Sequence, residues 1–166
     1  MRPIGWWGSK VRQFRAYVRA RVTPGERAEL ETWLTGPEIA LFERMHLADQ
    51  RHGLDVVATL RADGVGERDV LVAGLLHDAG KGRQVGLWPR VAWSLGEALG
   101  PWVMAVPRHL PGFGPALDRL RDHAALSAAL AAEAGCTERT VALIRDQAAP
   151  TDRDFGELLR LADEAN

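Results

Sequence analysis

The chain has 166 residues, and its 21 lysines and arginines against 22 aspartates and glutamates give a formal net charge of −1. This length fits one domain with a single sizeable core, and the balanced charge argues against a long nucleic acid as the main partner. Hydrophobic residues make up 46% and charged residues 26% of the sequence, which is typical of globular proteins and excludes a disordered or fibrous chain.

The only cysteine is Cys136, so the chain has neither an internal disulfide nor a thiolate zinc site of its own. The N-terminus lacks the apolar run of a secretory signal. No apolar stretch approaches the ~18 residues that cross a bilayer. We therefore expect a cytoplasmic protein without a transmembrane segment.

Residues 1–22 contain basic side chains and no acidic one, and the apolar residues Trp7, Val11, Phe14 and Val18 recur at steps of four and three. This spacing predicts an amphipathic helix as an N-terminal extension of the domain. Two interpretations are open: a helix packed on its own domain, which we favour, and a docking or membrane-surface element.

Helices are also predicted at 24–33, where Thr23 precedes a proline, from Gly36-Pro37 onward, and at 47–62. The apolar run at 70–76 fits a buried strand or a buried helix. Because no other segment offers it a strand partner, we predict a helix there.

Four more helices are predicted at 88–99, at 116–134, from the N-cap Thr137 to residue 144, and after the N-cap Thr151 with Asp154 in the capping-box position. Between them, residues 100–115 hold seven glycines and prolines, which predicts a loop with at most short helical turns. This loop either connects two helices or closes over a small substrate. The expected fold class is all-α.

His77 and Asp78 stand side by side at the end of the apolar run, shortly before Gly80. An imidazole and a carboxylate in this position can turn toward one point, which suits a metal ion. Buried histidine–carboxylate pairs are also common structural features. Upstream, His52 shares an apolar helical face with Met45. It is therefore either a buried histidine with a hydrogen-bond partner or a metal ligand.

Asp163 follows Leu159 by one helical turn near the C-terminus. An ionised carboxylate beside an apolar stripe is costly unless it is paired or bound to a metal. The alternative is a solvated carboxylate on a fraying helix end.

Taken together, His52, His77, Asp78 and Asp163 resemble the H…HD…D pattern of the HD-domain superfamily of metal-dependent phosphohydrolases. The resemblance covers about residues 49–166, and the segment 75–81 is its most specific part. The motifs at 48–53 and 162–166 are similar to those of a small bacterial subgroup. The resemblance implies a single HD domain over 1–166, an HD-domain helical bundle, and these four residues as metal ligands.

The resemblance also bears on the number of metal ions. Members with two metals add histidines after the HD pair, and His123 stands where the first is expected. The next follows in an Ile-x-x-His motif, but here Ile144 is followed by Gln147, whose neutral amide is a poor ligand. We therefore expect one divalent ion, Mn, Fe, Co, Ni, Zn or Mg, with His123 reaching the substrate phosphate or buried as a structural residue.

The activity implied is hydrolysis of a small phosphate ester, with a nucleotide as first candidate, by a metal-activated water. Asp78 would ligate the metal and orient the water, while His123 would protonate the leaving oxygen. Lys81 and Arg51 would neutralise the phosphate. Some nucleotide-hydrolysing members carry an acidic pair after the HD dipeptide, and Gly80-Lys81 replaces it here. The alternative is a catalytically silent HD-domain module that binds a nucleotide or metal.

Overall fold

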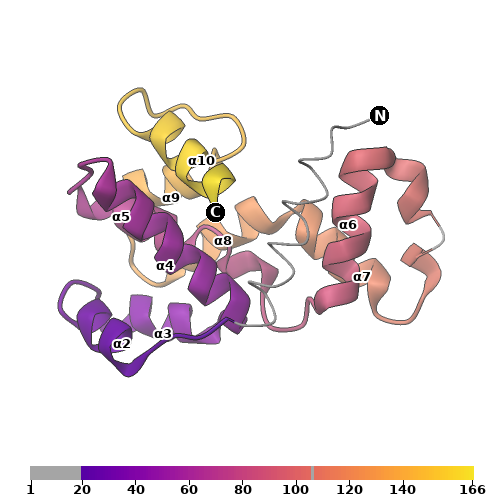
Figure 1. The fold of residues 1–166 in the computed structure, drawn as a ribbon, viewed down its shortest axis with the longest axis horizontal. Helices are drawn as coiled ribbons and strands as arrows, with labels where there is room; N and C mark the ends of the chain where they lie inside the picture. The colour runs from indigo at the N-terminus through magenta and orange to yellow at the C-terminus, as the bar shows by residue number, and fades with distance from the viewer. Residues whose placement is uncertain (1–19, 106) are drawn as a thin grey trace.

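The computed structural model describes residues 20–105 and 107–166, which form helices and turns without any strand (Figure 1). The all-α prediction is therefore confirmed over the described part of the chain. The predicted N-terminal helix at 1–22 lies, except for its last three positions, outside the described residues. No helix in the described part is long and apolar enough to cross a membrane.

The helices form a main bundle and an arm (Figure 1). The bundle contains α2 (Pro24–Glu31), α3 (Gly36–Arg44), α4 (Leu47–Ala62), α5 (Arg68–Leu76), η1 (Ala79–Lys81), α8 (His123–Glu133), α9 (Glu138–Arg145) and α10 (Gly156–Ala165). The arm contains α6 (Leu87–Leu99), the short turns η2 (Pro101–Met104) and η3 (Pro107–His109), and α7 (Phe113–Arg121).

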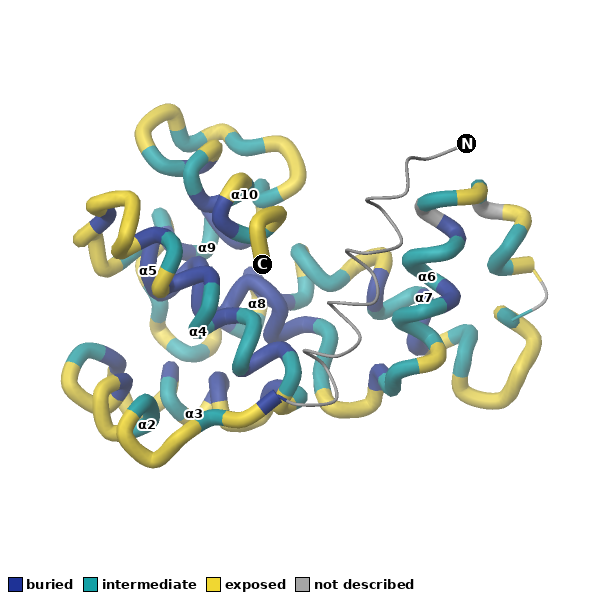
Figure 2. The backbone as a smooth tube through the Cα atoms, in the orientation of Figure 1, coloured by how far each residue is buried: buried dark blue, intermediate teal, exposed yellow. Residues whose placement is uncertain are grey.

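The main core lies between α4, α5, α8, α9 and α10, with α2 and α3 packed against it (Figure 2). Leu60, Leu75, Leu76 and Ile144 are fully buried there. A smaller apolar cluster, which includes Leu117, lies where the arm begins. The arm thus has its own small core and does not share that of the bundle.

Several helices begin or end where the capping residues and the apolar spacing of the sequence predict. Thr23 caps α2 in a reciprocal capping box with Glu26, and the Thr137 side chain accepts a hydrogen bond from the Thr140 N–H at the start of α9. The prediction for 47–62 matches the bounds of α4, and the apolar run at 70–76 is helical within α5. The segment 100–115 contains the short turns η2 and η3, although α7 already begins at Phe113.

Two predicted helices were wrong in their bounds. The single helix at 116–134 is divided at Asp122, whose φ of −99° and ψ of 8° are not helical, so His123 begins a new helix. The last helix begins at Gly156 and not after Thr151. The reason is that Asp152 accepts hydrogen bonds from the N–H groups of Asp154 and Phe155 at 3.0 and 2.9 Å, which holds this segment in a turn.

Two arginines attach the arm to the bundle. Arg90 of α6 makes a bidentate pair with the buried carboxylate of Asp49 in α4, at 2.7 and 2.6 Å. Arg119 of α7 donates from Nε to the carbonyl oxygen of Gly80, at 2.7 Å. Such charge-assisted bonds are stronger than neutral ones and fix geometry.

Glu38 is a buried carboxylate, 1% exposed, at the start of α3. It accepts hydrogen bonds from the Thr35 N–H at 2.7 Å and from the Arg68 guanidinium. Burial by itself raises the pKa of the Glu38 carboxyl, but these hydrogen bonds outweigh burial and hold the pKa below its ordinary value.

We expect Glu38→Ala to lower the free energy of unfolding by about 3 kcal/mol at pH 7, because it leaves Arg68 and the Thr35 N–H without their partner. The contribution of Glu38 is present above the pKa of an unfolded glutamate, about 4.3, and is lost as the pH falls through its lower folded value. Urea unfolding at pH 7 and in acid measures both effects.

The matched control is Glu43→Ala, because Glu43 is 56% exposed and lies 3.3 Å from Arg27. Its loss should change the free energy of unfolding by less than about 1 kcal/mol. Equal effects of the two substitutions would contradict the stabilising role of Glu38.

Candidate functional site

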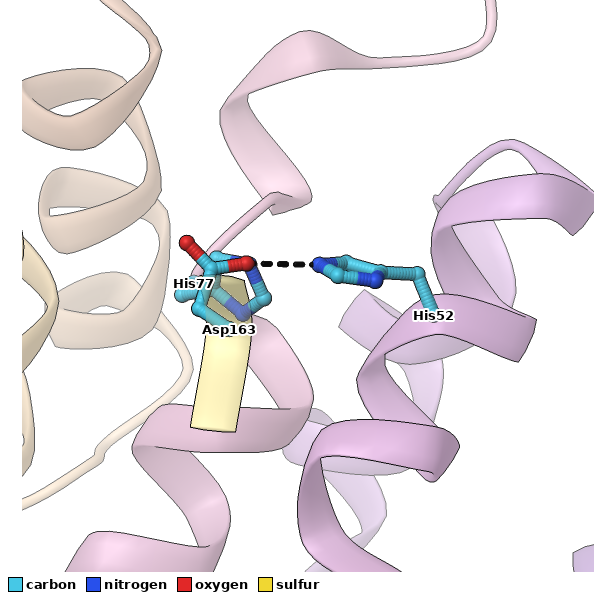
Figure 3. Close-up of side chains that lie close together, drawn as sticks. All are labelled: His52, His77 and Asp163. Carbon is cyan, nitrogen blue, oxygen red and sulfur yellow. Dashed lines mark hydrogen bonds and ion pairs between the residues drawn. The ribbon is translucent and has the colours of Figure 1, made fainter. Parts of the chain in front are cut away.

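His52 of α4, His77 at the end of α5 and Asp163 of α10 converge in the bundle (Figure 3). The Oδ1 atom of Asp163 lies 2.8 Å from His52 Nε2 and 3.3 Å from His77 Nε2. The two imidazole rings are 5.1 Å apart at an interplanar angle of 67°. One potential ligand atom from each residue lies within 4.8 Å of the other two, so the three could share one cation.

The orientation of His77 is fixed by the helix that precedes it. Its Nδ1 atom lies 2.9 Å from the Gly74 carbonyl oxygen, and because a carbonyl only accepts, Nδ1 is the donor. This leaves Nε2 directed at Asp163. A histidine that donates its other nitrogen to the backbone has the usual arrangement of a metal ligand.

Asp78 lies beside this cluster and is almost fully buried. Its Oδ1 atom is 3.6 Å from His77 Nε2 and 3.7 Å from His123 Nε2, while Oδ2 is 2.6 Å from Lys81 Nζ. The carboxylate of Asp78 therefore connects the cluster of His52, His77 and Asp163 to Lys81 and His123. The structure brings three of the predicted ligands together and places the fourth, Asp78, next to them.

His123 is the first residue of α8, and its Nδ1 atom donates to the Leu120 carbonyl oxygen at 2.7 Å. Burial, together with the positive charge of Lys81, lowers the pKa of this imidazole below its ordinary value. His123 is therefore neutral at pH 7 and presents an unprotonated Nε2 toward Asp78.

The pKa of His77 is raised, whereas the pKa values of Asp78 and Asp163 are lowered. Burial disfavours the imidazolium form of His77, but the carboxylates of Asp78 and Asp163 outweigh burial and raise its pKa to about 9. The pKa of Asp78 is held low against burial by Lys81 and then His77, and that of Asp163 by hydrogen bonds from His52 and His77. A proton on His77 thus helps to balance the two carboxylates, and a divalent cation can take its place.

Gly80 fixes the turn that carries Asp78 against α8. Its N–H donates to Ser127 Oγ at 2.8 Å, and its carbonyl oxygen accepts from Arg119 Nε at 2.7 Å. A Cβ atom at position 80 would lie 2.4 Å from the carbonyl oxygen of His123. Only glycine allows this contact, which brings Asp78 opposite His123.

Ser127 and Arg119 were not predicted as functional residues. Ser127 lies in an alanine-rich helix and Arg119 is one of several arginines, so nothing in the neighbouring sequence indicates a functional role for either residue. Their relation to Gly80 depends on how α7 and α8 pack, which the sequence pattern does not specify.

Two other predicted positions have different surroundings. Arg51 contacts Glu26 through Nη1, and its Nη2 lies 2.8 Å from Asp55 Oδ1, so its role in phosphate binding stays a prediction. The side-chain Nε2 atom of Gln147 is buried without a hydrogen-bond partner in the described part of the chain. Gln147 is not part of the cluster of His52, His77 and Asp163.

Comparison of the chain with protein-family models, with curated proteins and with solved structures gave no match. The functional interpretation therefore depends on the residues of the site and their geometry.

The spacing of His52 and His77 depends on Gly53, which follows His52 in α4. A Cβ atom at position 53 would lie 2.4 Å from the backbone oxygen of Leu75 in α5. We therefore expect Gly53→Ala to separate α4 from α5 and to lower the free energy of unfolding by about 1–3 kcal/mol. Chemical denaturation measures the change.

The control for this prediction is Gly25→Ala in α2, where an added Cβ would meet no atom within 4 Å. Alanine is the better helix former, so this variant should be as stable as the natural protein or slightly more so. A Gly53→Ala protein of unchanged stability would show that the helices tolerate the extra carbon.

Proposed function

We propose that this protein is an HD-domain phosphohydrolase that uses one divalent metal ion to hydrolyse a nucleotide or another small phosphate ester. The observation that carries the proposal is the convergence of His52, His77 and Asp163, with Asp78 beside them, in the order of the H…HD…D pattern. These groups are costly to bury, and they come from α4, from the end of α5 and from α10, the last of which is distant from the other two in the sequence.

The donor set fits a divalent transition metal. Two imidazole nitrogens and a carboxylate oxygen suit Mn, Fe, Co, Ni or Zn, and Mg is also compatible with the carboxylates. His52, His77, Asp163 and Asp78 would hold the ion. When bound, it would act as a Lewis acid and lower the pKa of a coordinated water.

The neighbouring side chains supply the remaining chemistry. Lys81, whose Nζ lies 2.6 Å from Asp78 Oδ2, places a positive charge where a phosphate would bind. Asp78 would orient the attacking water. The neutral His123 can take up a proton at Nε2, where the charge of Asp78 would stabilise the imidazolium, and in this form it would protonate the leaving oxygen.

A second candidate is a binding module that holds a nucleotide or metal without turnover. It is favoured by Gln147, which stands where two-metal members have a histidine, and by the contact between Lys81 and Asp78, which engages one carboxylate oxygen. Metal-dependent nucleotide binding without hydrolysis would identify this function.

The first test is metal content. We expect one equivalent of metal per chain after dialysis, and we expect Asp163→Ala to weaken Mn²⁺ affinity at least 10–100-fold by removal of a ligand. The control is Glu164→Ala, which removes an exposed neighbour that pairs with Arg160 and should leave affinity unchanged. Two tightly held equivalents, or equal affinity in both variants, would contradict the proposed centre.

The second test is activity on a panel of phosphomonoesters, phosphodiesters and nucleotides with several divalent ions. Asp78→Ala should abolish turnover. Lys81→Ala should keep the metal but lower kcat/KM by about 10–150-fold, the equivalent of one charged contact of 1.5–3 kcal/mol.

As a charge control, Arg145→Ala removes an exposed cation that pairs with Asp146 and should leave kcat/KM unchanged. Equal turnover by the natural protein and Asp78→Ala would exclude catalysis at this site.

A further inference from the structure

Arg119 differs from the neighbouring arginines of α7 and η3. Arg108 and Arg121 both pair with Asp118, at 2.7 and 3.2 Å. Arg119 is partly buried, and no carboxylate of residues 20–96, 98–100, 102–105 and 107–166 lies within ion-pair distance of it; its one polar contact among these residues is from Nε to the Gly80 carbonyl oxygen. Among these residues it is thus a cation without a carboxylate partner.

Arg119 contacts the turn that carries part of the proposed site. Gly80 lies between Asp78 and Lys81 in the turn that faces His123. In addition, Leu120, which follows Arg119, holds His123 through its carbonyl oxygen. The guanidinium is therefore anchored against the segment that carries the predicted phosphate-binding groups.

The guanidinium also lies along Gly82, the next glycine of this turn. A Cβ atom at Gly82 would lie 3.2 Å from Arg119 Nε and 3.5 Å from Nη2. Gly82 has a φ of +66°, which favours glycine. The turn is thus shaped to let the arginine side chain pass close to its backbone.

The chemistry of this arginine suits a second anion. A guanidinium has N–H donors in a planar fork, and the bond to Gly80 uses only the one at Nε, which leaves both Nη groups for a ligand. Lys81, by contrast, is already balanced by Asp78. A guanidinium with free Nη groups can bind a phosphate through two parallel hydrogen bonds.

We propose that Arg119 binds a second anionic group of the substrate, so that the preferred substrate is a phosphate ester with a further phosphate. This inference rests on the proposed function, in which the metal, Lys81 and His123 hold the phosphate that reacts. Arg119 then determines specificity, and it distinguishes doubly phosphorylated from singly phosphorylated compounds.

The test is isothermal titration calorimetry of Mn²⁺-loaded protein at a fixed free Mn²⁺ concentration. The probes are adenosine 5′-monophosphate, adenosine 5′-diphosphate and adenosine 3′,5′-bisphosphate, because the last two differ in the separation of their phosphates. We expect at least one of these two to bind about tenfold or more tightly than the monophosphate. Arg119→Gln should remove this preference, and it should weaken monophosphate binding no more than Ser127→Ala does, since each variant loses one hydrogen bond to Gly80.

Two control variants separate binding from a structural role. Ser127→Ala removes the other hydrogen bond to Gly80 and keeps the cation, so it should affect all three probes by the same factor. Arg153→Gln removes an exposed arginine in the segment before α10 and should change none of them.

The proposal is overturned if the natural protein binds the three probes equally, a result that needs no variant. It is also overturned if Arg119→Gln lowers the affinity for all three probes by the same factor, as loss of a purely structural arginine would. If the glutamine variant does not fold, Arg119→Lys takes its place. If the protein binds a doubly phosphorylated probe more tightly but hydrolyses none, the proposed hydrolytic function is contradicted, while the proposed role of Arg119 in binding specificity is supported. If no probe shows Mn²⁺-dependent binding, both proposals fail.

Discussion

The site depends on backbone contacts that two glycines allow. At Gly53 the α4 helix touches the backbone of α5, and at Gly80 the turn after α5 touches the start of α8. The first contact sets the separation of His52 and His77, and the second brings Asp78 opposite His123. A side chain at either position would move a pair of these residues apart, because backbone atoms cannot yield as a flexible side chain does.

These contacts gather charges that a protein interior does not otherwise favour. Asp78 is buried and Asp163 half-buried, and the pKa of each carboxyl is held low, that of Asp78 by Lys81 and His77 and that of Asp163 by His52 and His77. Such a cluster contributes less to stability than apolar packing of the same volume would. Its arrangement is explained better by a ligand than by the fold, since the core around Leu60 and Leu75 already holds the bundle together.

The sequence predicted those parts of the site that have a local or energetic signal. The bounds of α4 follow from its apolar spacing and terminal residues. His52, His77 and Asp163 are each costly to bury alone, and they were selected together because their order resembles the H…HD…D pattern. The break at Asp122 is not marked by a glycine or proline, and the turn held by Asp152 depends on local hydrogen bonds that compete with a helix start at Thr151. The two partners of Gly80 had no signal because they depend on contacts between segments that become neighbours only after the bundle has formed.

The arm that contains α6 and α7 contacts the bundle next to the residues of the candidate site. Arg90 contacts Asp49, one turn before His52 in α4, and Arg119 contacts Gly80, two residues after Asp78. The helix α7 also leads directly into His123 through Asp122. The groups that position the arm are therefore adjacent in the chain to those that form the site. A ligand bound by Arg119 would therefore link the arm to the proposed metal site.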